Sequence, residues 1–106
     1  MRTSCLSLQY LDEHLELFGF DRGALTMEPS DYFRRQCFVS VEEVEPALAA
    51  MVEAYPGSVV FASDYPHADG TFPGSTTDLL ETKEIDDDAV VRVLRDNARR
   101  LYGLTP

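Results

Sequence analysis

The sequence predicts an α/β protein built around a short parallel sheet, and three observations support this. Residues 58–62 form an apolar, β-branched run without alternation, which is typical of a strand covered on both faces. A second apolar segment within residues 36–41 indicates another strand, and a helical pattern lies between the two. Strand, helix and strand in this order predict a βαβ unit with parallel strands.

A helix is expected on the N-terminal side of this unit. Apolar residues recur at three- and four-residue steps from Leu8 to Phe18, which predicts a helix with one apolar face over about residues 6–18. Gly19 should end that helix, and residues 19–28 indicate a loop. Pro29 then opens a short helical turn, because proline suits the first position of a helix.

The centre of the chain predicts two more helices. The first spans about residues 43–55, with an apolar stripe that ends at Tyr55, and Pro56-Gly57 terminates it. Residues 63–74 are rich in proline and glycine and predict a loop. A short helix follows over about residues 75–82, where Ser75 and Asp78 form a weak capping box.

The last helix is the most strongly patterned segment. Its apolar stripe begins at Val90 and ends at Leu101, three aspartates precede it and Gly103 follows it. Asn97 interrupts the stripe, and a buried asparagine must find hydrogen-bond partners. We therefore expect Asn97 to bond to the backbone of a loop as structural support.

Length, charge and cysteine content restrict the class of protein. The 106 residues allow one small domain, and the net charge of −10 argues against binding nucleic acid or an anionic membrane. The longest apolar run has six residues, 47–52, whereas a membrane span needs ~20. Residues 1–5 contain no apolar segment of the kind that a signal peptide needs, so no signal peptide is expected. Cys5 and Cys37 are too few for a disulfide framework, so free thiols in the cytoplasm are expected.

The segment 62–70 contains the residues best suited to chemistry. Asp64 follows the predicted buried strand at its carboxyl end, where α/β proteins place ligand and catalytic groups. Asp64, His67 and Asp69 offer two carboxylates and an imidazole, which are possible ligands for a divalent metal. The plainer alternatives are that Asp64 only caps the loop and that His67 only donates hydrogen bonds within it.

The rest of the sequence completes no site. It contains no H-x-H pair, no H-E-x-x-H, no G-x-S-x-G and no phosphate-binding loop. Cys37 lies within a predicted strand and is expected to be a small core residue.

Three blocks of sequence, in this order, resemble the C-terminal end of the amidohydrolase-2 family. They span Tyr32–Ser40, Val60–Gly74 and Asp96–Leu104, and the likeness begins at about Leu8. This family comprises metal-dependent TIM-barrel hydrolases and decarboxylases related to aminocarboxymuconate-semialdehyde decarboxylase. The resemblance implies that residues 1–106 are a single partial domain, the C-terminal part of a (β/α)8 barrel with about two parallel strands and four to five helices.

The resemblance also implies a metal-binding role for one residue. The family holds a divalent metal, commonly zinc, at the mouth of the barrel, through an H-x-H pair, two further histidines and an aspartate at the end of the eighth strand. Asp64 matches that aspartate, which implies that it contacts the metal and transfers a proton. His67 is expected at most to support the metal ligands or to line the substrate pocket.

The sequence is compatible with two functions. The first is the C-terminal part of an enzyme that hydrolyses or nonoxidatively decarboxylates a small carboxylate, amide or lactone-type substrate. A barrel needs ~250 residues and several histidines, so the chain alone is expected to be inactive, and to form oligomers or pair with a complementary N-terminal part. The alternative is a non-catalytic remnant, or an interaction module that docks through an exposed sheet edge.

Overall fold

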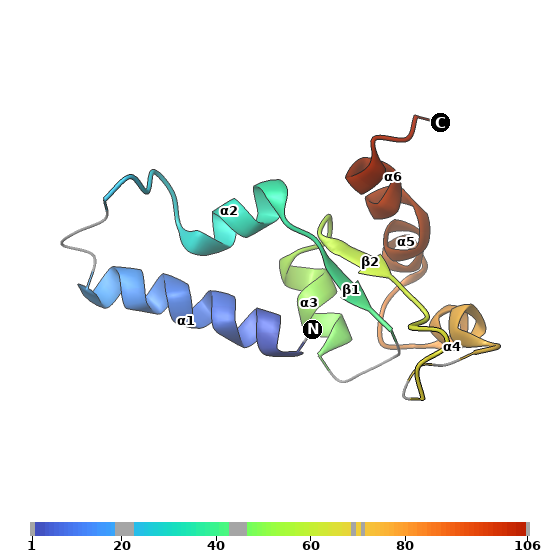
Figure 1. Ribbon diagram of the computed structural model, residues 1–106. Coiled ribbons are helices and arrows are strands. Elements are labelled where there is room, and N and C mark those ends of the chain that lie inside the picture. Colours follow the sequence, from blue (N-terminus) through green and yellow to red (C-terminus); the bar gives the residue numbers. More distant parts are fainter. Residues whose placement is uncertain (1, 19–22, 43–46, 69, 71, 106) are drawn as a thin grey trace.

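The computed structural model describes residues 2–18, 23–42, 47–68, 70 and 72–105, with side chains from residue 7 onward. The chain is elongated, with extents of 50 × 31 × 26 Å, and a helical arm projects from a small sheet and its helices (Figure 1). Its radius of gyration is 15.5 Å, whereas a compact domain of ~100 residues has about 13 Å. The described residues are therefore less compact than an ordinary single domain.

A two-stranded parallel sheet lies at the centre. Strand β1 spans Val39–Val41 and strand β2 spans Val59–Phe61, and Ser40 lies opposite Val60. Both strands are shorter than predicted. The predicted fold class is confirmed: the chain is α/β, with helices around parallel strands, as a part of an α/β barrel would be.

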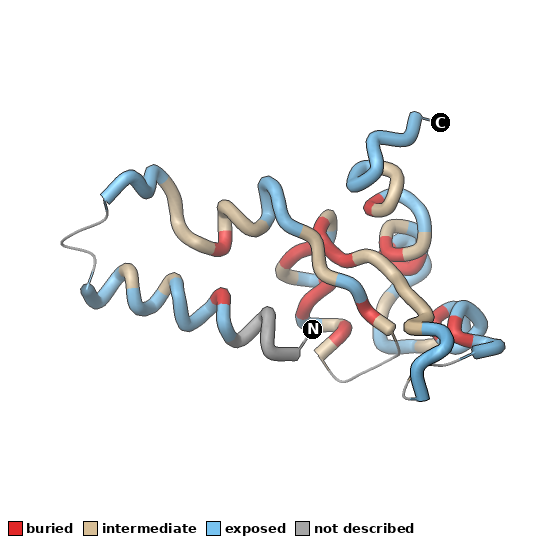
Figure 2. Tube along the Cα trace, viewed as in Figure 1, coloured by how far each residue is buried: buried red, intermediate tan, exposed pale blue. Residues whose placement is uncertain are grey.

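Helix α3, Leu48–Ala54, connects the two strands and supplies much of the core. Its residues Leu48 and Met51 are fully buried against Val41 of β1 and Val59 of β2, and Val93 from the last helix completes this cluster. Buried residues accordingly concentrate at α3, the strands and the last helix (Figure 2). The predicted start of this helix, residues 43–46, lies outside the described residues.

The two faces of the sheet differ in how well they are covered. Val41 and Val59 are buried in the core, whereas Ser40 is exposed and its neighbour Val60 is only half-buried. The prediction that residues 58–62 are covered on both faces is therefore wrong for the described chain. Among the described residues, one face of this run lies against the core and the other is only half covered.

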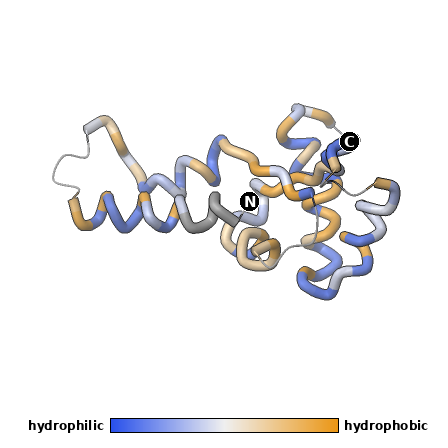
Figure 3. Tube along the Cα trace, turned by 60° about the horizontal axis from the view of Figure 1, so that its bottom comes forward, coloured by the Kyte–Doolittle hydropathy of each residue, from blue (hydrophilic) through white to orange (hydrophobic). Residues whose placement is uncertain are grey.

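Helices α1, Arg2–Phe18, and α2, Pro29–Gln36, form the projecting arm. The backbone N–H of Ser30 donates to Asp12 Oδ1 at 2.9 Å and ties the two helices together. Of the predicted apolar face of α1, Leu8 is buried but Leu11 is 52% exposed. Hydrophobic residues therefore recur along an arm that is largely open to solvent (Figure 3). Gly19, the predicted helix end, lies outside the described residues.

Helix α4, Ser75–Glu81, lies beyond the carboxyl ends of the strands. The predicted capping box is wrong, because Gly74 is the N-cap residue and no side chain caps this helix. Gly74 has φ of +104°, and its carbonyl accepts the N–H of Asp78 at 3.0 Å. A positive φ favours glycine, so glycine suits the residue that directly precedes this helix.

The last helix is continuous but contains a widened turn. It comprises α5, Asp87–Val91, a π-helical turn η2, Arg92–Asp96, and α6, Asn97–Tyr102. Asp86 Oδ1 accepts the N–H of Ala89 at 2.8 Å and caps the start, as its acidic sequence predicts. At the end Gly103 has φ of +65°, and Leu104 N–H donates to Arg99 O at 2.8 Å.

Two side chains differ from their predicted positions. Cys37 is a free and exposed thiol that ends α2 rather than a core residue of a strand, so that prediction is wrong. Leu101 was assigned to the apolar stripe of the last helix, but it is exposed. Among the described residues, no helix combines the length and hydrophobicity that crossing a membrane requires.

Candidate functional site

Asp64 lies three residues beyond β2, at the carboxyl end of the sheet. Its backbone adopts the left-handed region with φ of +58°, which aspartate tolerates better than most residues. The carbonyl of Asp64 accepts the N–H of His67 at 2.9 Å and closes a turn that includes Tyr65 and Pro66. The strand therefore stops before Asp64, and the turn presents its side chain at the end of the sheet.

The turn brings His67 back to Asp64. His67 Nδ1 lies 3.0 Å from Asp64 Oδ1, within ion-pair distance. The two side chains differ in exposure, because that of Asp64 is 24% exposed and that of His67 is 72% exposed. The structure thus brings together two of the three residues singled out in this loop, and the third, Asp69, lies outside the described residues.

Gly70 holds the backbone around Asp64 in place. A Cβ atom at this position would lie 2.7 Å from the carbonyl oxygen of Ser63 and 2.9 Å from that of Asp64. Both contacts are with backbone, which cannot move aside as a flexible side chain can. Only glycine therefore allows the loop to return this closely to the segment that carries the carboxylate.

The variant Gly70→Ala is expected to displace Asp64 and to lower the free energy of unfolding by about 1–3 kcal/mol, the usual cost of overpacking. Faster amide exchange of His67, whose N–H bonds to Asp64 O, reports the displacement. The matched comparison is Gly57→Ala, because there the atoms nearest to the new Cβ, at 3.2–3.4 Å, belong to the side chain of Arg100, which can shift by a few tenths of an ångström while it still bonds to the Gly57 carbonyl. An equal loss of unfolding free energy and an equal change in His67 amide exchange in the two variants would contradict this role of Gly70.

The start of β2 is held by the last helix. Asn97 is only 4% exposed, and its Nδ2 donates to Pro56 O at 2.9 Å and to Val59 O at 2.8 Å. Arg100 Nη2 donates to the neighbouring carbonyl of Gly57. The prediction that Asn97 bonds to loop backbone is confirmed, and these contacts fix the strand whose other end carries Asp64.

An aromatic pair adjoins the carboxylate. The rings of Tyr65 and Phe72 lie 4.4 Å apart between centroids, tilted by 51°, and each residue is 64% exposed. Tyr65 directly follows Asp64, so this apolar surface flanks the site. The pair has no signal in the sequence, because nothing in the spacing of the two residues indicates that the loop brings them together.

The residues fit a divalent metal only in part. Asp64 offers a carboxylate oxygen and His67 an imidazole nitrogen, whereas a catalytic zinc site uses three protein ligands. The part of the chain that the structure describes contains no cluster of three or more side chains suited to hold a metal ion. The described residues therefore offer two of the three ligands that such a site needs and do not complete one.

Comparison with protein families gives a match to the family described as Amidohydrolase, and it covers residues 8–104. The match includes both strands, the loop that carries Asp64 and His67, and Asn97 of the last helix. Comparison with curated proteins gives no match to this chain.

Proposed function

Because the chain belongs to the amidohydrolase family, we propose that it forms the part of a metal-dependent (β/α)8 barrel that carries the metal-binding carboxylate. In this proposal the complete enzyme hydrolyses or decarboxylates a small organic substrate. The observation that carries it is the position of Asp64, at the carboxyl end of a parallel strand, where barrel enzymes place their catalytic groups.

Asp64 is proposed both to bind the metal and to move a proton. A bound divalent metal would supply an activated water, because it lowers the pKa of water towards neutrality. The carboxylate of Asp64 is partly open to solvent, so a proton from water or substrate can reach it. His67 pairs with Oδ1 and thereby orients the carboxylate, while the ring pair of Tyr65 and Phe72 offers an apolar wall for the substrate.

We propose that further strands of the barrel complete this structure. Among the described residues each strand pairs on one edge only, and Ser40 remains exposed on the open face of the sheet. Open strand edges readily pair with other strands, and a two-stranded sheet is not stable alone. The exposed leucines of α1 and the large radius of gyration favour association in the same way.

Those strands would also bring the remaining metal ligands. Zinc is the proposed metal, because imidazole and carboxylate are ligands that it accepts in catalytic sites. We propose the cytoplasm as the compartment, since Cys37 is an exposed free thiol. The same open edges would serve the alternative function, a module that docks on a partner without catalysis.

Reconstitution separates these two functions. The chain is mixed with a polypeptide that carries the first six strands of an amidohydrolase-family barrel, including its H-x-H pair, and the mixture is analysed by size-exclusion chromatography. The proposal expects a stable complex, slower amide exchange at Ser40 and Val60, and hydrolase or decarboxylase activity. A complex without activity would favour the docking module. A compact monomer whose amides are all protected from exchange, and which forms no complex with the added strands, would contradict both functions.

A further inference from the structure

Arginine side chains gather around one turn at the amino end of the sheet. The turn, at residues 55–58, connects helix α3 to strand β2. Arg34 of α2 donates from Nε to Ala54 O at 3.2 Å, directly before the turn. Arg100 of α6 donates from Nη2 to Gly57 O, within the turn. Two helices that are far apart in the sequence thus place a guanidinium group beside the same turn.

Aromatic rings hold these two guanidinium groups in place. The guanidinium of Arg34 lies 4.7 Å from the ring centroid of Tyr55, and that of Arg100 lies 4.8 Å from the ring centroid of Phe38. Arg100 is exposed, and the side chain of Arg34 is 46% exposed. Because a guanidinium is a rigid fork, a stacked one loses little conformational freedom when it binds a carboxylate. Both groups are therefore oriented in advance and remain open to a partner.

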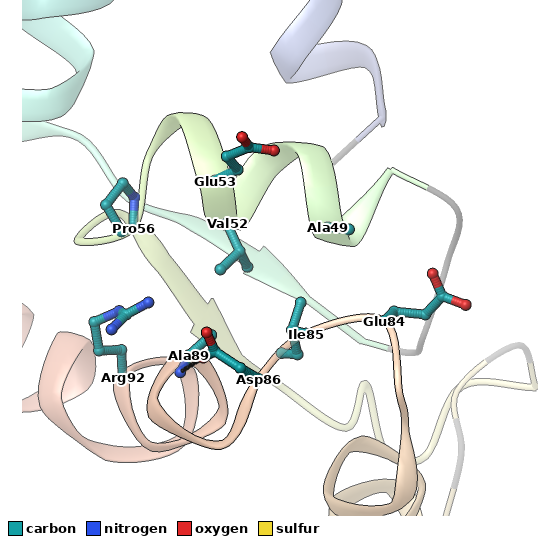
Figure 4. A pocket seen from close by; sticks show the side chains of 9 residues that line it. All are labelled: Ala49, Val52, Glu53, Pro56, Glu84, Ile85, Asp86, Ala89 and Arg92. Carbon is teal, nitrogen blue, oxygen red and sulfur yellow. Dashed lines mark hydrogen bonds between the residues drawn. The ribbon is translucent and has the colours of Figure 1, made fainter.

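A third arginine approaches the turn from the last helix. Figure 4 shows Arg92 at one end of a pocket of about 400 Å³ between α3 and the last helix, with its guanidinium directed towards Pro56 of the turn. The Nε of Arg92 is shielded from solvent and has no hydrogen-bond partner among the described residues. Arg92 therefore adds positive charge to the two guanidinium groups already at this turn.

The acidic side chains near the turn compensate this charge only in part. Asp31 pairs with Arg34, because its Oδ1 lies 3.0 Å from Nη1. Glu53 and Glu84 lie at the rim of the pocket, and their carboxylates point away from Arg92 (Figure 4). The chain as a whole has a net charge of −10, so a turn surrounded by arginines is a local exception. A patch of one sign attracts and orients a partner of the opposite sign.

The surroundings of the arginines restrict the kind of anion. A nucleic acid is disfavoured, since the guanidinium groups of Arg34 and Arg100 lie over the rings on which bases would stack. A small dicarboxylate is disfavoured as well, because these two arginines are exposed, whereas sites for small molecules enclose most of their ligand. Side-chain carboxylates of a protein match a guanidinium in both shape and charge.

From these constraints we propose that the arginines around residues 55–58 dock an extended acidic segment of another protein. Ala54 and Gly57, which anchor the two outer arginines, have Cα atoms at most about 11 Å apart, because each step along the chain spans about 3.8 Å. In an extended peptide, side chains two residues apart lie on one face at a spacing of ~7 Å. Two such carboxylates can reach Arg34 and Arg100 together. The surface lies at the opposite end of β2 from Asp64, so it is independent of the proposed barrel chemistry.

Titration of the full chain with capped glycine-serine octapeptides, followed by NMR, tests the proposal. A peptide with two glutamates separated by one residue is expected to bind about fivefold more tightly than a peptide with one glutamate, because it forms a second ion pair. Arg100→Gln should weaken binding of the two-glutamate peptide by about fivefold, the upper end for an exposed ion pair. The control Arg95→Gln removes an exposed arginine that pairs with Asp96 and should bind as the wild type does.

The variant Arg100→Gln is expected to fold, because Arg100 is exposed and glutamine is also a polar side chain with an amide donor. If it does not fold, the Nε–H resonance of Arg100 in the wild-type chain provides the second readout. This resonance should shift with the two-glutamate peptide and stay unmoved with a peptide that carries two lysines instead.

The proposal is overturned if the two-glutamate peptide does not bind, if it leaves the Arg100 resonance unmoved, or if Arg100→Gln binds it normally. Equal binding of the one-glutamate peptide or of free glutarate would overturn the extended acidic segment as the partner. An oligothymidylate that binds more tightly than the two-glutamate peptide would overturn it as well, because the surface would then prefer a nucleic acid.

Discussion

Replacing Asp64 by asparagine is expected to lower the turnover of the complete enzyme by about 10²–10⁴-fold, the usual contribution of a positioned acid or base. Asparagine keeps the size of the side chain but can neither accept a proton nor balance the charge of a metal. It also tolerates the left-handed backbone of this residue, where φ is +58°. The variant should therefore retain the fold and lose the chemistry.

The measurement is the rate of product formation by the reconstituted enzyme, with thermal unfolding as the check on folding. Asp78→Asn is the matched control, because Asp78 is an exposed aspartate of α4 outside the loop that carries the site. It should leave the rate unchanged. Full activity of Asp64→Asn would remove this carboxylate from the mechanism.

Replacing Asn97 by alanine is expected to lower the free energy of unfolding by about 2–4 kcal/mol. The change removes two hydrogen bonds and leaves the buried carbonyl of Val59 and the partly buried carbonyl of Pro56 without this donor. A loss of this size is a large part of the stability of a small domain. Urea denaturation followed by circular dichroism measures it.

The control for this prediction is Arg95→Ala in the preceding turn. Arg95 is exposed and, within the described part of the chain, pairs with its neighbour Asp96, so its loss should change stability by less than about 0.5 kcal/mol. Asn97→Asp should be at least as harmful as the alanine variant, because it sets a carboxylate against two carbonyl oxygens. An alanine variant as stable as the control would show that the two contacts do not support β2.

The sequence predicted the elements whose pattern is local. The βαβ order, the acidic start of the last helix and the glycine that ends it all follow from residue types at fixed spacing, and the structure confirms them. Asn97 was also predictable, because a polar residue in an apolar stripe must find partners, and its partners are backbone carbonyls as expected.

The features that were missed have no signature in residue type or spacing. The π-helical turn at Arg92 has no sequence signal, and neither does the close approach of Gly70 to the carbonyls of Ser63 and Asp64. Cys37 was assigned to the core because its neighbours are apolar, but the strand begins only at Val39. Spacing along a sequence does not report where the chain folds back on itself.

The open face of the sheet was predicted incorrectly for a different reason. The apolar run 58–62 indicates a strand covered on both sides, and the described chain covers one side well. In the proposed barrel the other side faces the interior, so Val60 would be covered by strands that the described residues do not include. The pattern thus fits the barrel better than it fits the isolated sheet.

The most direct test is the metal content of the chain reconstituted with the complementary barrel strands, measured by elemental analysis after removal of free metal. We predict close to one tightly bound divalent ion per wild-type complex, and a clear loss of that ion when Asp64 is replaced by alanine. A wild-type complex without metal, or an alanine variant that retains the ion as tightly as the wild type, would contradict a metal-binding role for Asp64.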